Sequence, residues 1–244
     1  MGVDSHWRKL TKIVILQPSF LPWLGYFDQY DWADTFVIYD DTKFDKHGWR
    51  NRNRILSPTG VQWLTVPVRT KGRMQPLNTE ITIANERKWA KKLTTTLRQS
   101  YSNQPYFKQY FPQLESILNE PYSRLINLNL NCLRWLIESL GLPQKFVLSS
   151  QLSGEGQRTR RLIAICRELK ATDYLSGNSA QNYIDKNQFQ AANIRLHWHN
   201  YQHPVYQQGT ETFHPYLSTV DLLFRQGPQS LQILCQNRRA YKSI

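Results

Sequence analysis

Two short apolar runs near the N-terminus constrain the fold more than any other feature of this chain. Residues 13–16 read IVIL, residues 36–39 read FVIY, and a segment with helical spacing lies between them. Such a succession predicts a strand, a helix and a second strand that pairs in parallel with the first. The first run ends at Gln17 and the second at Asp40 and Asp41. Because ligands bind at the carboxyl ends of strands in open α/β sheets, the sequence predicts a site there.

The same alternation resumes in the second half of the chain. Short apolar runs again alternate with segments of helical spacing, which is typical of successive βα units. Together with the first runs, they predict strands over residues 12–17, 35–39, 145–149, 173–176 and 194–198. The spacing predicts helices over residues 22–33, 159–169, 179–185, 215–224 and 228–237.

The middle of the chain has a different pattern. Residues 48–56 and 61–67 are separated by Ser-Pro-Thr-Gly, a turn-rich tetrapeptide that predicts a β-hairpin. A short alternating segment over residues 80–84 predicts a third antiparallel strand. This part of the chain therefore differs from the βα units on either side of it.

Helical spacing dominates residues 87–140. Pro105, Pro112 and Pro121 interrupt it and predict three helices, the last over residues 123–140. We therefore predict a Rossmann-like, three-layer α/β fold with a mostly parallel sheet. Residues 1–244 form a single domain in this interpretation, with the hairpin and helical segment inserted at about residues 47–142.

Composition and charge narrow the class of protein. A hydrophobic content of 40%, including 13% aromatic residues, excludes a disordered chain. The net charge of +13 favours a phosphate-bearing or polyanionic ligand, and a solvated basic face is the alternative. One stretch holds a single acid, Asp45, among many cations, namely Lys43, Lys46, Arg50, Arg52, Arg54, Arg69, Lys71 and Arg73.

The chain has no apolar run as long as a membrane span, and residues 1–10 lack the apolar core of a secretory signal. We therefore expect a cytoplasmic protein without a membrane span. Cys132, Cys166 and Cys235 are far apart and indicate neither a disulfide framework nor a zinc knuckle. No sequence pattern indicates a particular cofactor or a particular oligomeric state.

The loop after the first strand reads QPSFLPWLGYF. Nucleotidylyl transferases with a HIGH motif carry two histidines at this place, whereas this chain has Trp23 and Tyr26. We interpret Gln17 as a contact for a base or sugar on which Trp23 stacks; a proline-shaped turn with aromatic packing is the alternative. Asp40 and Asp41, after the second strand, suit a ribose contact, a Mg²⁺ ligand or a general base, with a turn cap as the alternative.

The segment WRNRN carries many polar groups in a short space. Strand alternation predicts that Trp49, Asn51 and Asn53 share one face, while Arg50, Arg52 and Arg54 share the other. One face then offers amides and an indole, and the other offers cations for phosphate. An edge strand protected by charge shows the same arginine alternation.

Two later strand-to-helix junctions face the same predicted edge. LSGEGQRT contains Gly154 and Gly156, whose amides suit a phosphate with Arg158 assisting; a flexible connection is the alternative. The second junction is LSGNSAQNYID, and its candidate residues are Ser176, Gly177, Asn178 and Tyr183. Two such junctions favour a shared pocket.

Four histidines occur late in the chain, two of them in the pattern His197-x-His199. That pair suits a metal, but no third ligand has diagnostic spacing, so we predict no metal site. His203, in HPVYQQ, suits a general base, and a structural histidine is the alternative. The chain has no G-x-S-x-G elbow, Walker loop or full G-x-G-x-x-G motif, which disfavours an NAD enzyme or a P-loop kinase.

Several long strings resemble the WbqC-like protein family. They are QPSFLPWLGYF from Gln17, FVIYDD from Phe36, WLTVPV from Trp63, PYFKQYFPQLESIL from Pro105 and HPVYQQ from His203. The resemblance covers nearly the whole chain. The family is a bacterial group found among genes for O-antigen and other surface polysaccharides, so the resemblance implies a role in sugar modification.

These observations lead to one main hypothesis and two alternatives. The main one is a transferase that modifies an activated sugar or similar phosphate-bearing metabolite in surface-polysaccharide or secondary-metabolite biosynthesis. The alternatives are an RNA-associated protein, with tRNA as a possible acyl donor, and a non-catalytic scaffold of a polysaccharide-assembly complex. The expected catalytic residues are Asp40, Asp41 and His203. The expected substrate-binding residues are Gln17, Trp23, Tyr26, Trp49, Asn51, Arg52, Asn53, Ser176, Gly177, Asn178, Tyr183, Tyr206 and Gln207.

Overall fold

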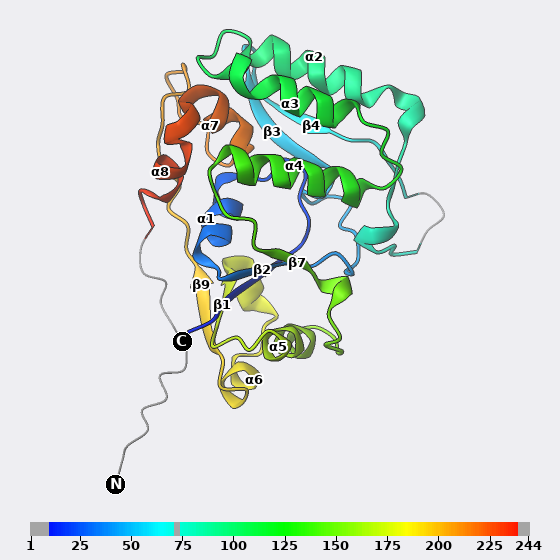
Figure 1. The fold of residues 1–244 in the computed structure, drawn as a ribbon, viewed down its shortest axis with the longest axis vertical. Helices are drawn as coiled ribbons and strands as arrows, with labels where there is room; N and C mark the ends of the chain where they lie inside the picture. The colour runs from blue at the N-terminus through cyan, green and yellow to red at the C-terminus, as the bar shows by residue number, and fades with distance from the viewer. Residues whose placement is uncertain (1–9, 71–73, 239–244) are drawn as a thin grey trace.

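A parallel five-stranded sheet forms the centre of the computed structural model, which describes residues 10–70 and 74–238 (Figure 1). The N-terminal segment before residue 10, and Lys71 and Arg73 of the basic stretch, lie outside the described residues. The strand order is β7-β2-β1-β8-β9. The strands are β1 (Lys12–Leu16), β2 (Thr35–Ile38), β7 (Phe146–Leu148), β8 (Asp173–Gly177) and β9 (Arg195–His199).

The strand order places a topological switch point next to β1. The chain runs outward from β1 through β2 to β7, and then returns to the other side of β1 to form β8 and β9. In β1, Val14 pairs with Phe36 of β2 on one side and with Leu175 of β8 on the other. The Rossmann-like prediction is confirmed, and β1 and β8 are neighbours in the sheet, with Gln17 and Ser176 at its carboxyl edge.

Alternate residues of the strands enter two different cores. Val14 and Phe36 pack in a large core with α1 and the inserted helices, whereas Ile13, Ile15 and Val37 pack in a smaller core with α5 and α6. Side chains alternate between the two faces of a strand, so continuous apolar runs arise where both faces are covered. The helices of the parallel-sheet part are α1 (Leu24–Trp32), α5 (Thr159–Glu168), α6 (Lys186–Ala191), α7 (Thr219–Gln226) and α8 (Ser230–Cys235).

The insertion between β2 and β7 begins with β-structure. Strands β3 (Arg52–Ser57) and β4 (Gly60–Thr65) form the predicted hairpin. The predicted third strand is wrong in its pairing, because β6 (Thr82–Ile83) pairs with β5 (Val68–Arg69) instead of the hairpin. Pro67 lies between β4 and β5, where the missing amide hydrogen limits extension of the ladder.

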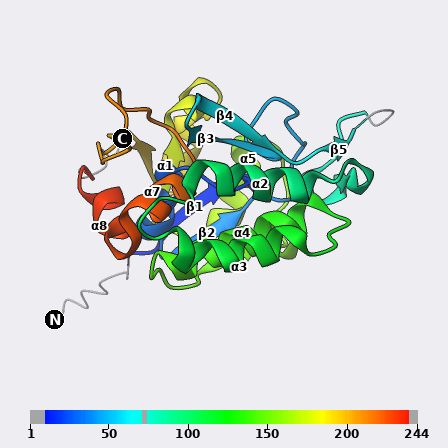
Figure 2. The same ribbon diagram turned by 90° about the horizontal axis from the view of Figure 1, so that it is seen from above.

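Three helices complete the insertion and lie side by side over one face of the sheet, with the hairpin next to α2 (Figure 2). They are α2 (Trp89–Tyr101), α3 (Phe107–Asn119) and α4 (Leu125–Ser139). The predicted interruption at Pro112 is wrong, because Pro112 lies inside α3. The helix buries Phe107, Phe111 and Leu114 on one side, and this packing offsets the loss of one backbone hydrogen bond.

Short 3₁₀ helices connect several of these elements: Asn78–Glu80, Asn85–Arg87, Ser149–Gln151, Asn178–Asn182 and Gly227–Gln229. The sequence predicted one helix over residues 179–185, where the structure has a 3₁₀ turn followed by α6. Asp185 caps α6 by accepting from the backbone amides of Asn187 and Gln188, which fixes the later start. In the part of the chain that the structure describes, no helix combines the length and apolarity needed to cross a membrane.

Candidate functional site

A cavity of about 600 Å³ lies at the carboxyl edge of the sheet, where β1 and β8 adjoin. This is the switch point of the strand order, where doubly wound sheets bind ligands. Its wall combines the ends of both strands with α1, the loop before β3, and the start of α5. The described lining residues are Ile15, Leu16, Gln17, Ser19, Trp23, Tyr26, Gln29, Tyr39, Trp49, Arg50, Arg158, Leu162, Tyr174, Ser176, Gly177, Ser179, Ala180 and Tyr183.

Seven of the thirteen expected substrate-binding residues line this cavity: Gln17, Trp23, Tyr26, Trp49, Ser176, Gly177 and Tyr183. They come from three separate parts of the chain: residues 17–26, residue 49 and residues 176–183. Tyr183 is 62% exposed at the surface, whereas Tyr26 is 4% exposed. The cavity therefore extends from an accessible rim to a buried polar interior, and the functional roles of these residues stay predictions.

Arg50 carries positive charge into the buried part of the cavity. Its Nη1 donates to Pro18 O over 2.9 Å, and its Nε has no hydrogen-bond partner among the described residues. Burial lowers the pKa of this guanidinium, while Tyr26 and Asp45 act in the opposite direction. An arginine stays protonated at neutral pH even so, which makes this wall attractive to an anion.

The segment before β3 corrects one prediction. Strand alternation placed Trp49 and Arg50 on opposite faces together with their alternate neighbours, but β3 begins only at Arg52. The Trp49 ring lies 5.3 Å from the ring of Trp63 and 5.6 Å from the guanidinium of Arg54. Because residues 46–49 form a turn, Trp49 contacts the arginine side of the hairpin although it lines the cavity together with Arg50.

Asn51, Arg52 and Asn53 lie outside the cavity lining and hold the surrounding backbone. The Asn53 side-chain amide donates to the carbonyls of Phe20 and Leu21, over 3.2 and 2.7 Å. Asn51 donates to the Val66 carbonyl, and Arg52 to the carbonyls of His47 and Gly48. These contacts shape the loop that carries Trp23 and the turn that carries Trp49.

Asp40 also lies outside the cavity lining, and its carboxylate is enclosed by donors. It is 1% exposed and accepts from the Ser149 hydroxyl, the Ser150 amide and the Ser150 hydroxyl, over 3.0, 3.0 and 2.7 Å. Asp41 pairs with Arg161 over 2.8 Å. These contacts support a role in joining the ends of β2 and β7, and the expected catalytic role of both acids stays a prediction.

His203 lies in an aromatic cluster behind Trp23. Its ring contacts those of Tyr201 and Tyr216, and both of these contact the indole of Trp23. Burial lowers the pKa of His203, and its ring nitrogen Nδ1 bonds to Pro204 O. The imidazole does not line the cavity, so its expected function as a base stays a prediction.

The remaining expected contacts are further from the cavity. Tyr206 is buried and donates to Asp221 over 2.8 Å, and the backbone of Gln207 accepts from Gln226. Asn178, which is exposed, accepts from Gln181. None of these three is among the described lining residues.

The loop with Gly154 and Gly156 differs from the expected phosphate loop. The amides of Ser153 and Gly154 donate to the carboxylate of Glu168, so they face an anion of the protein itself. Arg158, at the start of α5, does line the cavity, and it has a positive φ of 51°. A non-glycine residue in this conformation is uncommon and is often found at functional sites.

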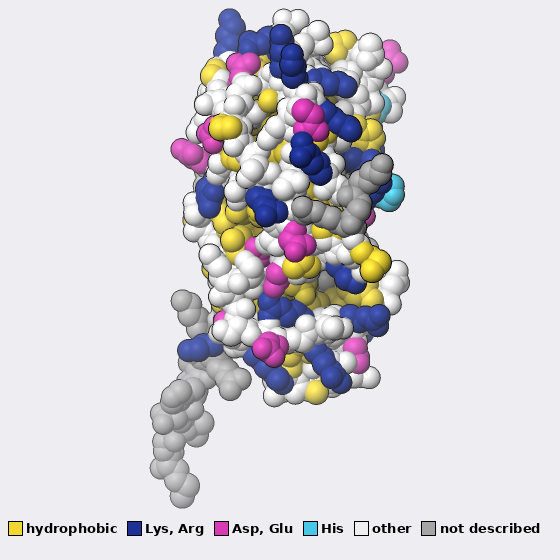
Figure 3. All heavy atoms as spheres, turned by 90° about the vertical axis from the view of Figure 1, so that its right-hand side faces the viewer, with side chains coloured by type: hydrophobic (Ala, Val, Ile, Leu, Met, Phe, Trp, Pro, Cys, Tyr) yellow, Lys and Arg dark blue, Asp and Glu magenta, His cyan; other side chains and the backbone are white. Residues whose placement is uncertain are grey.

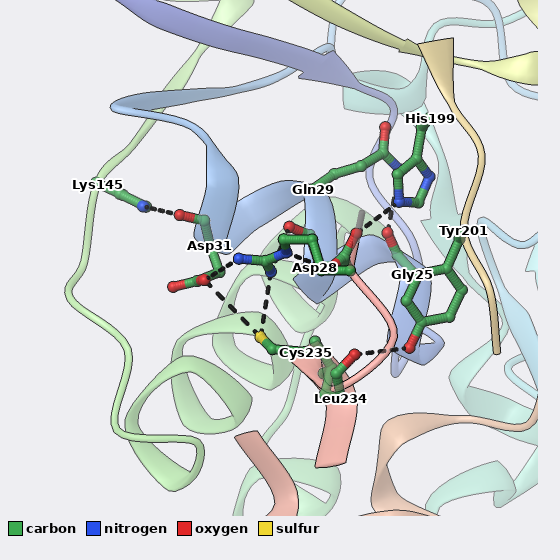
Figure 4. A network of polar contacts seen from close by, with 10 residues as sticks. Gly25, Asp28, Gln29, Asp31, Lys145, His199, Tyr201, Leu234 and Cys235 are labelled. Carbon is green, nitrogen blue, oxygen red and sulfur yellow. Dashed lines mark hydrogen bonds and ion pairs between the residues drawn. The ribbon is translucent and has the colours of Figure 1, made fainter. Parts of the chain in front are cut away.

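A network of ion pairs holds helix α1, whose residues form one wall of the cavity (Figure 4). Asp28 receives contacts from His199 over 2.8 Å and from Arg238 over 2.6 Å. Arg238 also contacts Asp31 over 2.6 Å. His197 pairs with Asp173, so each histidine of the His-x-His pattern is held by a carboxylate.

Sequence reasoning did not select five polar residues that line the cavity: Ser19, Gln29, Tyr39, Tyr174 and Ser179. Tyr39 and Tyr174 lie within strand-like apolar runs, and Gln29 lies within a helical pattern, where only a tertiary contact distinguishes a pocket residue from a core residue. Arg50 and Arg158 were both expected from the sequence as cations for a phosphate, and both line the cavity.

The lining favours binding and charge stabilisation. Burial raises the pKa values of Tyr39, Tyr174 and Tyr183, so these phenols are protonated donors at neutral pH. Among the described lining residues there is no Asp, Glu or His. Arginines and phenols are suited to stabilise negative charge on a bound group.

These features define an α/β protein of Rossmann-like topology with a cavity of small-molecule size at its switch point. The chain belongs to the WbqC-like protein family, whose profile matches residues 17–233. It is also 36% identical over 223 residues to uncharacterized protein Rv1507c of Mycobacterium tuberculosis, a match that covers 91% of this chain and 96% of that protein. No solved structure matches the chain.

Proposed function

We propose that this protein is a transferase that modifies an activated sugar or a similar small metabolite carrying phosphate. The observation that carries the proposal is the cavity at the switch point between β1 and β8, with Arg50 inside it and Arg158 in its lining. A volume of about 600 Å³ is within the usual range for small-molecule sites. The assignment to surface-polysaccharide or secondary-metabolite biosynthesis rests on the family resemblance.

The lining supports this substrate class through two kinds of contact. Trp23 and Trp49 offer indole faces, which suit a sugar ring or a nucleobase. Arg50 and Arg158 offer guanidinium groups, which suit phosphate oxygens. In a transfer reaction these cations stabilise the charge that develops on the phosphate or on the leaving group.

A ligand panel with a turnover assay tests the proposal. The purified protein is incubated with nucleotide sugars, ATP or acyl-CoA, each with and without Mg²⁺, and is followed by thermal shift and by mass spectrometry of the products. A ligand at about 100 times its dissociation constant adds about 2.7 kcal/mol to the free energy of unfolding. We expect one nucleotide class to raise the melting temperature and to be consumed once its acceptor is supplied.

Variants then connect any activity to the cavity. Arg50→Gln removes the buried cation and is expected to raise the dissociation constant of the phosphate-bearing ligand at least tenfold. Arg69→Gln is the matched control, because Arg69 forms an exposed pair with Glu86 outside the lining. Equal binding by both variants would contradict the proposal, and silence across the whole panel would favour the scaffold alternative.

A second candidate, an RNA-associated protein, is favoured by a stack of side chains on the hairpin. The Arg52 guanidinium lies 4.5 Å from the Trp63 ring, which lies 5.3 Å from the Trp49 ring, and Arg54 lies 5.6 Å from Trp49. Trp63 is 46% exposed. Alternating aromatic and cationic groups suit the bases and phosphates of a single strand.

The distribution of charge bears on this second candidate. Figure 3 shows Lys and Arg side chains spread over one face of the molecule, with Asp and Glu among them. The RNA candidate predicts that bulk tRNA binds with a steep dependence on salt and that Trp63→Ala weakens this binding. Filter binding at several salt concentrations is the measurement, and a flat salt response would contradict it.

A further inference from the structure

Four side chains that line the cavity each have a buried polar atom without a hydrogen-bond partner among the described residues. These atoms are Gln17 Oε1, Tyr26 Oη, Gln29 Oε1 and Arg50 Nε. Tyr26 and Gln29 are each 4% exposed. Native structures satisfy most buried polar groups, so several unpartnered atoms on one cavity wall require an explanation.

The positions of these groups place them on neighbouring parts of that wall. Tyr26 and Gln29 are three residues apart on α1, and residues with this spacing lie on the same face of a helix. Gln17 directly follows β1, and Arg50 lies close enough to Tyr26 for each to influence the pKa of the other. We call this group of four residues the polar recess.

The contacts that these residues do make leave specific groups available. The Gln29 Nε2 atom donates to Gly25 O over 3.1 Å, so its Oε1 remains as an acceptor. Arg50 donates to Pro18 O through Nη1, so its Nε remains as a charged donor. The recess therefore offers a cationic donor, a phenol, and amide oxygens that need N–H or O–H donors.

We infer that the polar recess binds the anionic end of a ligand, a phosphate or a carboxylate, together with hydroxyl or amino donors on the neighbouring carbon atoms. The anion accepts from Arg50 Nε and the phenol of Tyr26. The neighbouring donors bond to the amide oxygens of Gln17 and Gln29. This inference rests on the proposed function and deepens it, because it specifies which end of the substrate lies deepest in the cavity.

Small probes test the recess directly. Isothermal titration compares inorganic phosphate, glycerol phosphate and glycerate, with neutral glycerol at the same concentration. We expect glycerol phosphate or glycerate to bind about tenfold more tightly than inorganic phosphate, because each adds hydroxyl donors to an anion. The preferred probe distinguishes a phosphate from a carboxylate as the anionic group. Equal affinity of the three anions would overturn the inference, since the amide oxygens would then contribute nothing.

Variants supply a readout that a purely structural role would not give. Tyr26→Phe and Gln17→Met replace an unpartnered polar atom by an apolar group of similar shape. An unpartnered buried group contributes nothing favourable to folding, so both variants are expected to keep or raise the melting temperature. The same variants are expected to raise the dissociation constant of the preferred probe about tenfold. A lower melting temperature with unchanged probe affinity would overturn the inference.

Tyr101→Phe is the matched control. The Tyr101 hydroxyl donates to Asp221 over 2.7 Å and accepts from the Leu56 amide, and Tyr101 does not line the cavity. This control is expected to lower the melting temperature without changing the affinity of the probe. The opposite result, with weakened probe binding, would show that the probe does not report on the recess.

The recess and the transferase proposal can fail separately. If small anions bind and Tyr26→Phe lowers their affinity, the inference about the polar recess holds even where no nucleotide sugar is consumed. If a nucleotide sugar is consumed but Tyr26→Phe and Gln17→Met leave the binding of every probe and substrate unchanged, the transferase stands and the recess inference fails.

Discussion

The indole ring of Trp23 lies directly against the backbone of Gly25. A Cβ atom at position 25 would come within 2.1 Å of Trp23 Cη2 and 2.5 Å of two further ring atoms. Trp23 lines the cavity, and its ring also contacts Tyr201 and Tyr216. The absence of a side chain at position 25 therefore fixes where this wall of the cavity lies.

Gly25→Ala is expected to displace the Trp23 ring, because a methyl group cannot fit at this distance. Overpacking of this kind costs about 2 kcal/mol of the free energy of unfolding. Chemical denaturation measures the change in stability, and titration with glycerol phosphate measures any effect on the cavity. In a Trp23→Ala background the same substitution should cost much less. Equal costs in both backgrounds would show that the Trp23 contact is not the reason.

Asp40→Asn is expected to destabilise the protein by about 2 kcal/mol, because a charged acceptor of three hydrogen bonds is replaced by a neutral amide. Denaturant unfolding checks this value. Glu86→Gln is the comparison, since Glu86 belongs to an exposed ion pair with Arg69, and it should cost less. An unchanged stability of Asp40→Asn together with lost turnover would instead support the catalytic role predicted from the sequence.

Arg238→Ala is expected to destabilise the protein by about 3 kcal/mol, because it removes a partner from the buried carboxylate of Asp28. The loss should also loosen α1 and weaken binding in the cavity. Urea denaturation and ligand titration measure the two effects. Arg69→Ala removes an exposed ion pair and is expected to change little. Similar losses in both variants would contradict the importance of the Asp28 network.

The stability of the protein is expected to depend on the protonation of His203. Burial lowers the pKa of this imidazole below its ordinary 6.5, so the folded state favours the neutral ring. The contribution of His203 to stability is therefore present above pH 6.5 and is lost as the pH falls through the lower pKa of the folded state. Between about pH 7.5 and about pH 5, the melting temperature of His203→Gln should fall less than that of the unchanged protein. Parallel pH profiles would contradict this account.

The cores of the sheet were predictable because their signals are local. The runs that contain Val14 and Val37 are buried on both faces, and such strands read as continuous apolar segments. The hairpin was predictable for the same reason, since a turn tetrapeptide separates its strands. The pairing partners of the strands were harder to predict from the sequence. The short strand β6 has no local feature that shows whether it pairs with β5 or with β4.

The candidate site was only partly predictable. Gln17 follows one predicted strand, and Ser176 is the last residue of another. The rule that ligands bind at strand ends therefore selects both from the sequence. Asp40 satisfies the same rule, yet Ser149 and Ser150 enclose its carboxylate. Those serines are more than a hundred residues away in the sequence, and no local pattern indicates the contact.

The sequence by itself determined the parallel α/β class, the position of the insertion between β2 and β7, and the sheet edge at which the cavity lies. Periodicity and turn residues are properties of neighbouring positions, which is why they can be read from the chain alone. The tertiary structure decided that Arg50 and Trp49 both line the cavity and that Trp49 also packs on Trp63. That choice depends on a turn before β3 and on contacts between distant segments, and burial and hydrogen bonding are set only when those segments meet.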